Sequence, residues 1–177
     1  MKKIYVLLMK TKTSTDRFIR FMTKYEYSHV AISLDKSCEK TYSFGRKKPH
    51  SILNGGFITE NKNGPFFKVF NDTTCKIYEV ETSDEQYEQL KNIIQTMEEK
   101  RDTYKYDYLG IAYRFFNIPK TYENKYVCSY FVADVLEKSN IHKFEKEPCF
   151  IRAEDFEDFE NLDKFKEIYS GKYLLYE

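Results

Sequence analysis

Residues 125–140 have the clearest periodicity in the chain and constrain its fold more than any other segment. Counted from Cys128, apolar residues recur at the spacing of one helical face. They are Phe131, Val132, Val135 and Leu136. This pattern predicts a helix that packs on a hydrophobic core and carries Cys128 in its first turn.

Cys128 would then lie where a helix stabilises negative charge. The free N–H groups of the first turn and the helix dipole favour a thiolate, so we expect them to lower the pKa of the thiol. Free cysteine is also among the most buried residue types, and Cys128 could simply be a small hydrophobic residue at the head of the apolar face. This helix alone leaves both interpretations open.

Length and charge limit the class of protein. The 177 residues suit one domain, residues 1–177, with a core large enough to fold unaided. Because 29 basic and 28 acidic residues give a net charge of +1 without long runs of either sign, we expect neither a nucleic acid nor an anionic membrane as main partner. The 16 Tyr and 15 Phe can supply the core.

The N-terminal apolar run, Ile4 to Met9, follows two lysines but is too short for the hydrophobic region of a signal peptide. It predicts a first β-strand. No segment approaches the length of a membrane span. We therefore expect a cytoplasmic protein, with an unknown oligomeric state.

The cysteines suggest neither a metal site nor a disulfide framework. Cys38, Cys75, Cys128 and Cys149 form no CxxC pair and no regular spacing with the three histidines. We predict no metal and no cofactor, and a reducing environment.

A histidine lies in a strand-like segment far upstream of the cysteine. Residues 27–35 alternate between apolar side chains and a face that carries His29 and small residues. A second strand over residues 40–45 would pair with it and place Thr41 and Ser43 on the histidine's face. Alternatively, His29 is an ordinary histidine at the end of a strand.

The remaining segments complete an α+β domain with a mostly antiparallel sheet. A helix over residues 13–26 would carry an apolar stripe of Phe18, Phe21, Met22 and Tyr25. Residues 46–65 form the longest loop-like region; only residues 57–60 are strand-like there, and His50 is expected to face solvent. The other predicted elements are strands at 66–70, 75–82, 166–169 and 173–176, and helices at 83–101, 107–116 and 153–159.

Two local sequences together resemble a known family. The segments YSHVAISLD from Tyr27 and VCSYFVADVL from Val127 are similar to the permuted papain-like branch of the NlpC-type superfamily, the YiiX/YycO-like proteins and, more distantly, the lecithin retinol acyltransferase-like enzymes. In that branch the histidine strand precedes the cysteine helix, as here. The resemblance covers residues 27–176 and implies a circularly permuted papain-like fold in a bacterial or phage protein.

The resemblance also implies residue roles. Cys128 would be the nucleophile and His29 the general base that returns the proton to the leaving group. The family's third residue follows on the next strand, where we choose Ser43 because it faces the histidine. A hydroxyl cannot stabilise imidazolium as a carboxylate does, so Glu60 is the alternative.

An oxyanion would be bound by the Cys128 N–H and by Tyr106 or Tyr108 in the tyrosine-rich segment of residues 103–108, unless these tyrosines only pack. The expected function is that of a cysteine hydrolase of the peptidase or amidase type, acting on a small peptide, amide or acyl ester through an acyl-thioester intermediate. The alternatives are a lipid acyltransferase or esterase and a binding or scaffold module without turnover. A catalytic pair would make Cys128 the most reactive of the four thiols, fastest to label below neutral pH.

Overall fold

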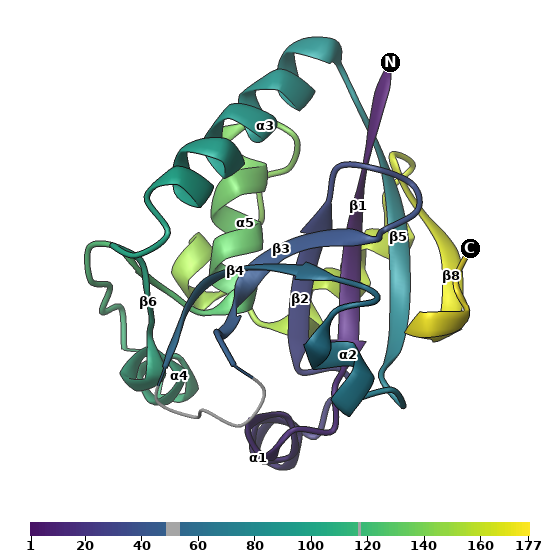
Figure 1. Cartoon of the computed structure of the whole chain (residues 1–177). Helices are drawn as coiled ribbons and strands as arrows, with labels where there is room; N and C mark the ends of the chain where they lie inside the picture. Colours follow the sequence, from purple (N-terminus) through teal and green to yellow (C-terminus); the bar gives the residue numbers. More distant parts are fainter. Residues whose placement is uncertain (49–53, 117) are drawn as a thin grey trace.

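The structure is a computed structural model that describes residues 1–48, 54–116 and 118–177. His50 therefore lies outside the described residues. The chain forms an α+β fold around one mostly antiparallel sheet, as the sequence predicts (Figure 1). The sheet has the order β4-β3-β2-β1-β5-β8, and all neighbours in it are antiparallel. Its strands are β1 (Lys2–Lys10), β2 (His29–Ser33), β3 (Lys40–Arg46), β4 (Gly55–Asn61), β5 (Thr74–Thr82) and β8 (Phe165–Lys172).

β1 lies in the middle of the sheet and is buried on both faces. Every residue from Ile4 to Met9 is buried, which explains why this segment is continuously apolar rather than alternating. β1 pairs with β2 on one side and β5 on the other. The N-terminal strand predicted from the sequence is thus the centre of the fold.

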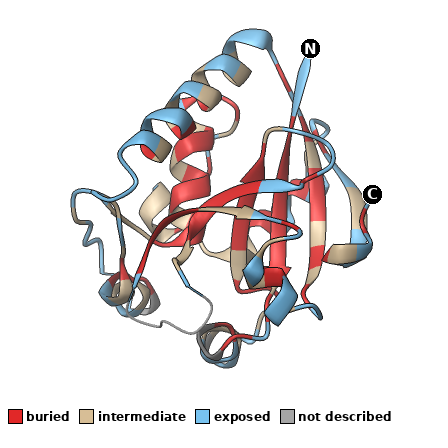
Figure 2. Cartoon of the chain, in the orientation of Figure 1, coloured by how far each residue is buried: buried red, intermediate tan, exposed pale blue. Residues whose placement is uncertain are grey.

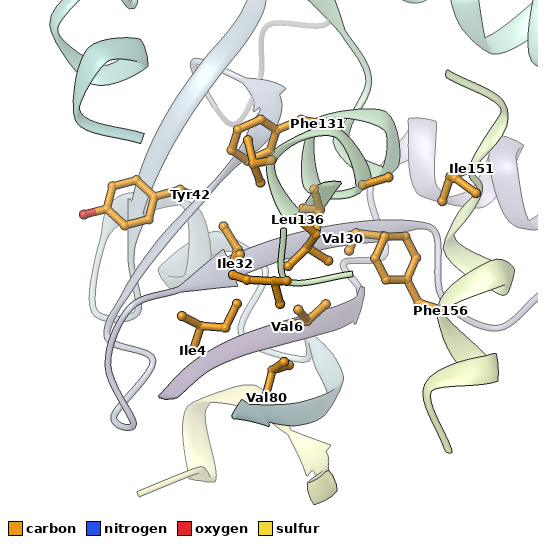
Figure 3. Packing of buried hydrophobic residues seen from close by; sticks show 14 of the residues in the cluster. Ile4, Val6, Val30, Ile32, Tyr42, Val80, Phe131, Leu136, Ile151 and Phe156 are labelled. Carbon is orange, nitrogen blue, oxygen red and sulfur yellow. The ribbon is translucent and has the colours of Figure 1, made fainter. Parts of the chain in front are cut away.

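One face of the sheet packs against helices and forms the larger core (Figure 3). The helices there are α3 (Asp84–Glu99) and α5 (Cys128–Lys138), and the 3₁₀-helix η2 (Ala153–Asn161) also contributes to this core. Val30, Ile32 and Phe44 face these helices as the alternation predicts, and Phe131 of α5 contacts Phe44 with ring centroids 5.3 Å apart. Figure 2 shows the buried side of α5 turned toward the strands.

The opposite face of the sheet carries a smaller core. It is covered by α2 (Pro65–Val69) and by the 3₁₀-helix η3 (Tyr173–Leu175). Phe67 and Tyr173 are fully buried, and their ring centroids lie 4.7 Å apart. The sheet is therefore the middle of three layers.

Two further helices lie at one end of the sheet, where β2 begins (Figure 1). They are α1 (Ser14–Thr23) and α4 (Tyr108–Phe115). The short strand β6 (Lys105–Tyr106), just before α4, pairs in parallel with β7 (Lys125–Tyr126), which leads into the cysteine helix. The 3₁₀-helix η1 (Pro148–Phe150) follows α5. This end of the molecule holds both Cys128 and His29.

Several predicted elements are wrong or need correction. Residues 66–70 are mostly helical, since Gly64 and Pro65 form the N-terminal end of α2 and proline is favoured at the first helical position. Residues 173–175 form η3 rather than a strand. The strand expected at residues 57–60 is present as β4, which is two residues longer at its start and one at its end. The predicted acidic helix is the 3₁₀-helix η2.

The apolar stripe predicted for α1 is not a core face. Phe18 and Phe21 are 57% and 80% exposed, and the side chain of Met22 lies outside the described part of the structure. The buried side of α1 instead carries Asp16. Within the described ranges, no helix combines the length and the apolar character that crossing a bilayer requires.

Candidate functional site

Cys128 is the first residue of α5, as the periodicity predicts. Val127 is the N-cap and provides no side-chain hydrogen bond, and the first turn contains no acidic residue. The Cys128 sulfur donates a long hydrogen bond of 3.9 Å to the carbonyl oxygen of Ser28, so the start of α5 abuts the residue before His29. The thiol is buried.

The pKa of Cys128 corrects the expectation of an activated thiolate. Burial raises the pKa above its ordinary value, while the backbone N–H groups of Val30, Ser129 and Cys128 and the charge of Arg114 lower it. The helix terminus thus acts in the predicted direction, but burial outweighs it. The resting group is a neutral thiol surrounded by backbone donors.

His29 is the first residue of β2 and lies opposite Met9 of β1. A Cβ atom placed on Gly45 would lie 3.7 Å from the His29 Cε1 atom and 2.8 Å from Ile58 Cδ1, so the ring lies close to Gly45 of β3, next to the Ile58 side chain. Burial lowers the pKa of His29 to about 4. The imidazole is therefore neutral at pH 7 and can accept a proton.

The structure brings His29 and Cys128 to the same end of the sheet, where the Cys128 sulfur bonds to the backbone beside His29 rather than to its ring. No hydrogen bond joins their side chains among the contacts of the described residues. His29 lines one hollow and Cys128 lines an adjoining one. The residues common to both are Ile19, Ser28, Tyr106 and Tyr108. The alternation of β2 explains the separation, because Val30 faces the α5 layer and its neighbour His29 faces away from it.

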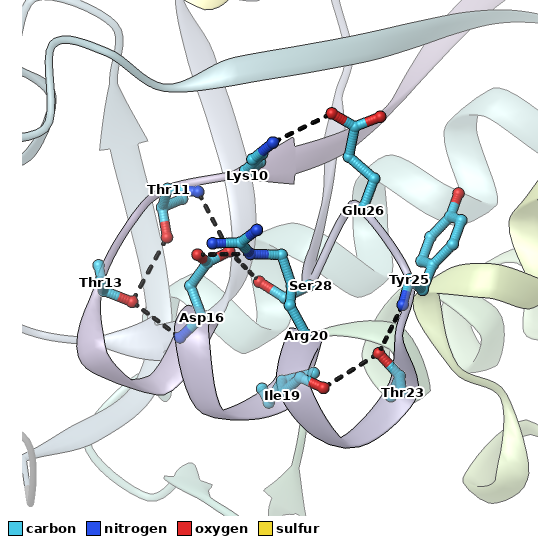
Figure 4. Close-up of polar contacts among 10 residues, drawn as sticks. All are labelled: Lys10, Thr11, Thr13, Asp16, Ile19, Arg20, Thr23, Tyr25, Glu26 and Ser28. Carbon is cyan, nitrogen blue, oxygen red and sulfur yellow. Dashed lines mark hydrogen bonds and ion pairs between the residues drawn. The ribbon is translucent and has the colours of Figure 1, made fainter.

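Asp16 is an acidic residue near the histidine that the sequence analysis missed. It lies on α1, is buried, and lines the same hollow as His29. Its carboxylate accepts hydrogen bonds from the Ser28 hydroxyl, from Arg20 Nε at 3.0 Å and from Thr11 N at 3.3 Å (Figure 4). Its negative charge raises the pKa of His29 and opposes the effect of burial. The only signal in the sequence was its place after the N-cap residue Thr13.

Neither residue chosen to hold the histidine contacts it. Ser43 is on the predicted face, but its hydroxyl donates a 2.6 Å hydrogen bond to the Val30 carbonyl. Glu60 lines the hollow that contains His29, yet it pairs with Thr41, which precedes Gly45 on β3. Burial raises the pKa of Glu60 to about 8. Ser43 thus fastens β3 to β2, and Glu60 lies farther along the hollow.

Both predicted tyrosines lie at the site. Tyr106 and Tyr108 line the two hollows, and their ring centroids are 4.8 Å apart. Burial raises the pKa of Tyr106 well above its ordinary value, and a negative charge on Cys128 raises it further. Tyr106 is therefore a neutral hydroxyl within electrostatic reach of the sulfur.

The hollow that contains Cys128 is a cleft of about 550 Å³, a size typical of small-molecule sites. It runs between α1, α4 and the start of α5. Most of its lining is apolar, including Phe18, Ile19, Tyr27, Ile111, Phe116 and Val127. Its polar lining includes Ser129, Arg114, Arg152 and Glu154.

The hollow that contains His29 is much smaller, about 60 Å³. Among residues 1–48, 54–116 and 118–177, no three His, Cys, Asp or Glu side chains are grouped to hold a metal ion.

The sequence matches no protein-family model, and no curated protein matches it. The candidate site thus depends on its geometry and on the motifs around His29 and Cys128.

Proposed function

We propose that this protein is a cysteine hydrolase of the peptidase or amidase type with Cys128 as nucleophile and His29 as base. The observation that carries the proposal is the position of the Cys128 sulfur: it lies at the N-terminus of α5, beside an apolar cleft and near three backbone N–H groups. Such groups stabilise the negative oxygen of a tetrahedral intermediate. The order of histidine strand and cysteine helix supports a permuted papain-like topology.

The reaction follows from the resting states of the two side chains. His29 accepts the proton of the Cys128 thiol as the sulfur attacks the acyl carbon, and then gives that proton to the departing amine or alcohol. Water hydrolyses the resulting thioester and regenerates the thiol. Because both groups rest neutral, proton transfer accompanies the attack, which requires the imidazole to approach the sulfur from the adjoining hollow.

Asp16 is the proposed positioning residue for His29. Its carboxylate is fixed by Ser28 and Arg20, and its charge would stabilise the imidazolium that forms during attack. This assignment replaces Ser43, whose hydroxyl bonds to the backbone.

A lipid acyltransferase or esterase is the second candidate, favoured by the apolar lining of the cleft. A panel of p-nitrophenyl esters and p-nitroanilides with short and long acyl chains separates the two candidates by the preferred leaving group and chain length. With any turned-over substrate, we expect Cys128→Ala to lower kcat/KM about a thousandfold and His29→Ala about a hundredfold.

The matched control is Cys149→Ser, which replaces a partly buried cysteine outside the cleft lining and should leave the rate unchanged. Intact-mass spectrometry should detect an acyl group on Cys128 that hydroxylamine removes. Turnover that survives Cys128→Ala would rule out the proposed nucleophile. If no substrate of the panel reacts and no adduct forms, the alternative of a binding module is the better description.

A further inference from the structure

Arg114 is a buried arginine beside the candidate nucleophile. It lies in the last turn of α4, and its side chain is only 7% exposed. Nε, Nη1 and Nη2 are all buried without a hydrogen-bond partner among the described residues. Leaving a buried donor unmatched destabilises a protein, so three such nitrogens point to a missing acceptor.

The neighbours of Arg114 only partly compensate its charge. Asp107 Oδ2 lies 3.7 Å from Arg114 Nη1, which is beyond hydrogen-bond distance, and it too lacks a hydrogen-bond partner among the described residues. The other carboxylate oxygen, Asp107 Oδ1, accepts a 2.8 Å hydrogen bond from Gly110 N. The guanidinium stacks over Tyr130 at 5.3 Å. The second arginine of the cleft, Arg152, is satisfied by the Arg114 carbonyl at 3.0 Å and by Glu154 at 3.3 Å.

The unmatched donors of Arg114 lie beside the cleft that contains Cys128. It lines the cleft together with Cys128 and Ser129, at the N-terminus of α5. That terminus has no side-chain cap and no acid in its first turn, so the positive end of the helix dipole adjoins the guanidinium, whose counter-charge is the Asp107 carboxylate at 3.7 Å, beyond hydrogen-bond distance. An anionic group at this point would accept hydrogen bonds from the guanidinium and would also be stabilised by the N-terminus of α5.

We infer that Arg114 is a substrate-specificity residue that binds a carboxylate of the substrate next to the acyl carbon attacked by Cys128. The substrates would be amides or esters with a free carboxylate at this end and an apolar group along the cleft. A planar guanidinium suits a carboxylate because two parallel N–H···O bonds can form. The long side chain would turn from Asp107 toward the cleft. The inference rests on the proposed role of Cys128.

A pair of alkylating reagents tests this without a known substrate. Iodoacetate and iodoacetamide attack thiols alike but differ in the carboxylate. We would measure both rates at Cys128 by peptide mass spectrometry and divide each by the rate of the same reagent with N-acetylcysteine. The normalised iodoacetate rate should exceed the iodoacetamide rate about tenfold, as one hydrogen bond to a charged group provides.

Arg114→Gln should abolish that preference. Arg114→Lys should keep part of it, because lysine retains the positive charge but cannot form two parallel N–H···O bonds. Arg101→Gln, at an arginine outside the cleft lining, is the control and should change nothing. Equal normalised rates in the parent protein, or a preference that survives Arg114→Gln, would overturn the inference and leave Arg114 as a structural partner of Asp107.

Two further measurements keep the outcome clear. If circular dichroism shows that Arg114→Gln does not fold, acetate should slow iodoacetamide labelling of Cys128 in the parent protein while acetamide does not; equal effects would overturn the inference. His29→Ala tests the proposed catalytic pair separately, because it should lower the iodoacetamide rate without removing the preference for iodoacetate.

Discussion

Burial sets the protonation states of the candidate pair. It raises the pKa of Cys128 and lowers that of His29 to about 4, so neither group is charged at pH 7. The charged partners nearby, Arg114 and Asp16, favour the ions that a reaction would form. The site is thus a neutral resting pair in surroundings that stabilise its ionised form.

The labelling of Cys128 by iodoacetamide should reflect this resting state. Between about pH 5 and 7 we expect Cys128 to react more slowly than the partly buried Cys149, because burial raises the pKa of both thiols and restricts access more strongly at Cys128. Peptide mass spectrometry of the labelled protein measures both rates. Faster labelling of Cys128 in this range would mean that thiolate and imidazolium form spontaneously, as the sequence alone suggested.

Glu60 is a carboxyl group that burial keeps protonated, with a pKa of about 8. As pH rises, Glu60 loses its proton near pH 4.5 in the unfolded chain but only near pH 8 in the folded protein. The free energy of unfolding therefore falls between about pH 4.5 and 8. Glu60→Gln should therefore leave stability unchanged at pH 4 and increase it by about 2 kcal/mol at pH 8.5, a value discounted for partial exposure. Urea unfolding at the two pH values measures the difference, and an equal effect at both would contradict the assignment.

Among the elements, the two helices of the larger core, α3 and α5, differ in how their N-termini are capped. α3 starts with a complete capping box, in which Ser83 accepts from Gln86 N at 3.1 Å and Gln86 accepts from Ser83 N at 2.9 Å. α5 starts without a cap and keeps its N–H groups directed at the cysteine. The first arrangement stabilises a helix, and the second leaves donors free for a ligand.

Removing the α3 cap should have a measurable effect. Ser83→Ala is expected to lower the free energy of unfolding by about 1 kcal/mol, since it deprives the first turn of an acceptor. Thr96→Ala in the same helix is the control, because the Thr96 hydroxyl is exposed and bonds back to the Asn92 carbonyl. Chemical denaturation compares the two; equal losses would show that the box contributes nothing specific.

At the scale of the whole molecule, the sheet is buried on both faces, and the C-terminal segment closes one of them. Tyr173 fills the smaller core and donates a 2.5 Å hydrogen bond to the Cys38 carbonyl. Its ring also lies 5.6 Å from the Lys62 ammonium group, which bonds to the Tyr176 carbonyl. These contacts tie the chain's end to the turn after β2.

Tyr173→Ala should therefore destabilise the whole fold by about 3–5 kcal/mol, the range for deleting a buried aromatic ring. Leu175→Ala, two positions later and 70% exposed, should cost less than about 0.5 kcal/mol. Thermal unfolding followed by circular dichroism distinguishes them. A similar small loss for both would show that η3 is not part of the cooperative core.

The sequence alone predicts the elements whose signals are local. Continuous apolar character predicts β1, strict alternation predicts β2 and its inward-facing Val30 and Ile32, and helical periodicity places Cys128 at the start of α5. Local chemistry fails where two structures compete, as at residues 66–70. There the preceding Gly64 and Pro65 begin a helix, although the apolar run also suits a strand.

Only the tertiary structure decides what surrounds the site. Burial depends on which elements cover a side chain, so the raised pKa of Cys128 and the lowered pKa of His29 are not readable from a helix terminus or a strand. The same holds for Asp16 and Arg114, which α1 and α4 bring to the start of β2 and α5 from distant parts of the chain. The sequence determines which side chains can do chemistry here, and long-range packing determines their charge and their neighbours.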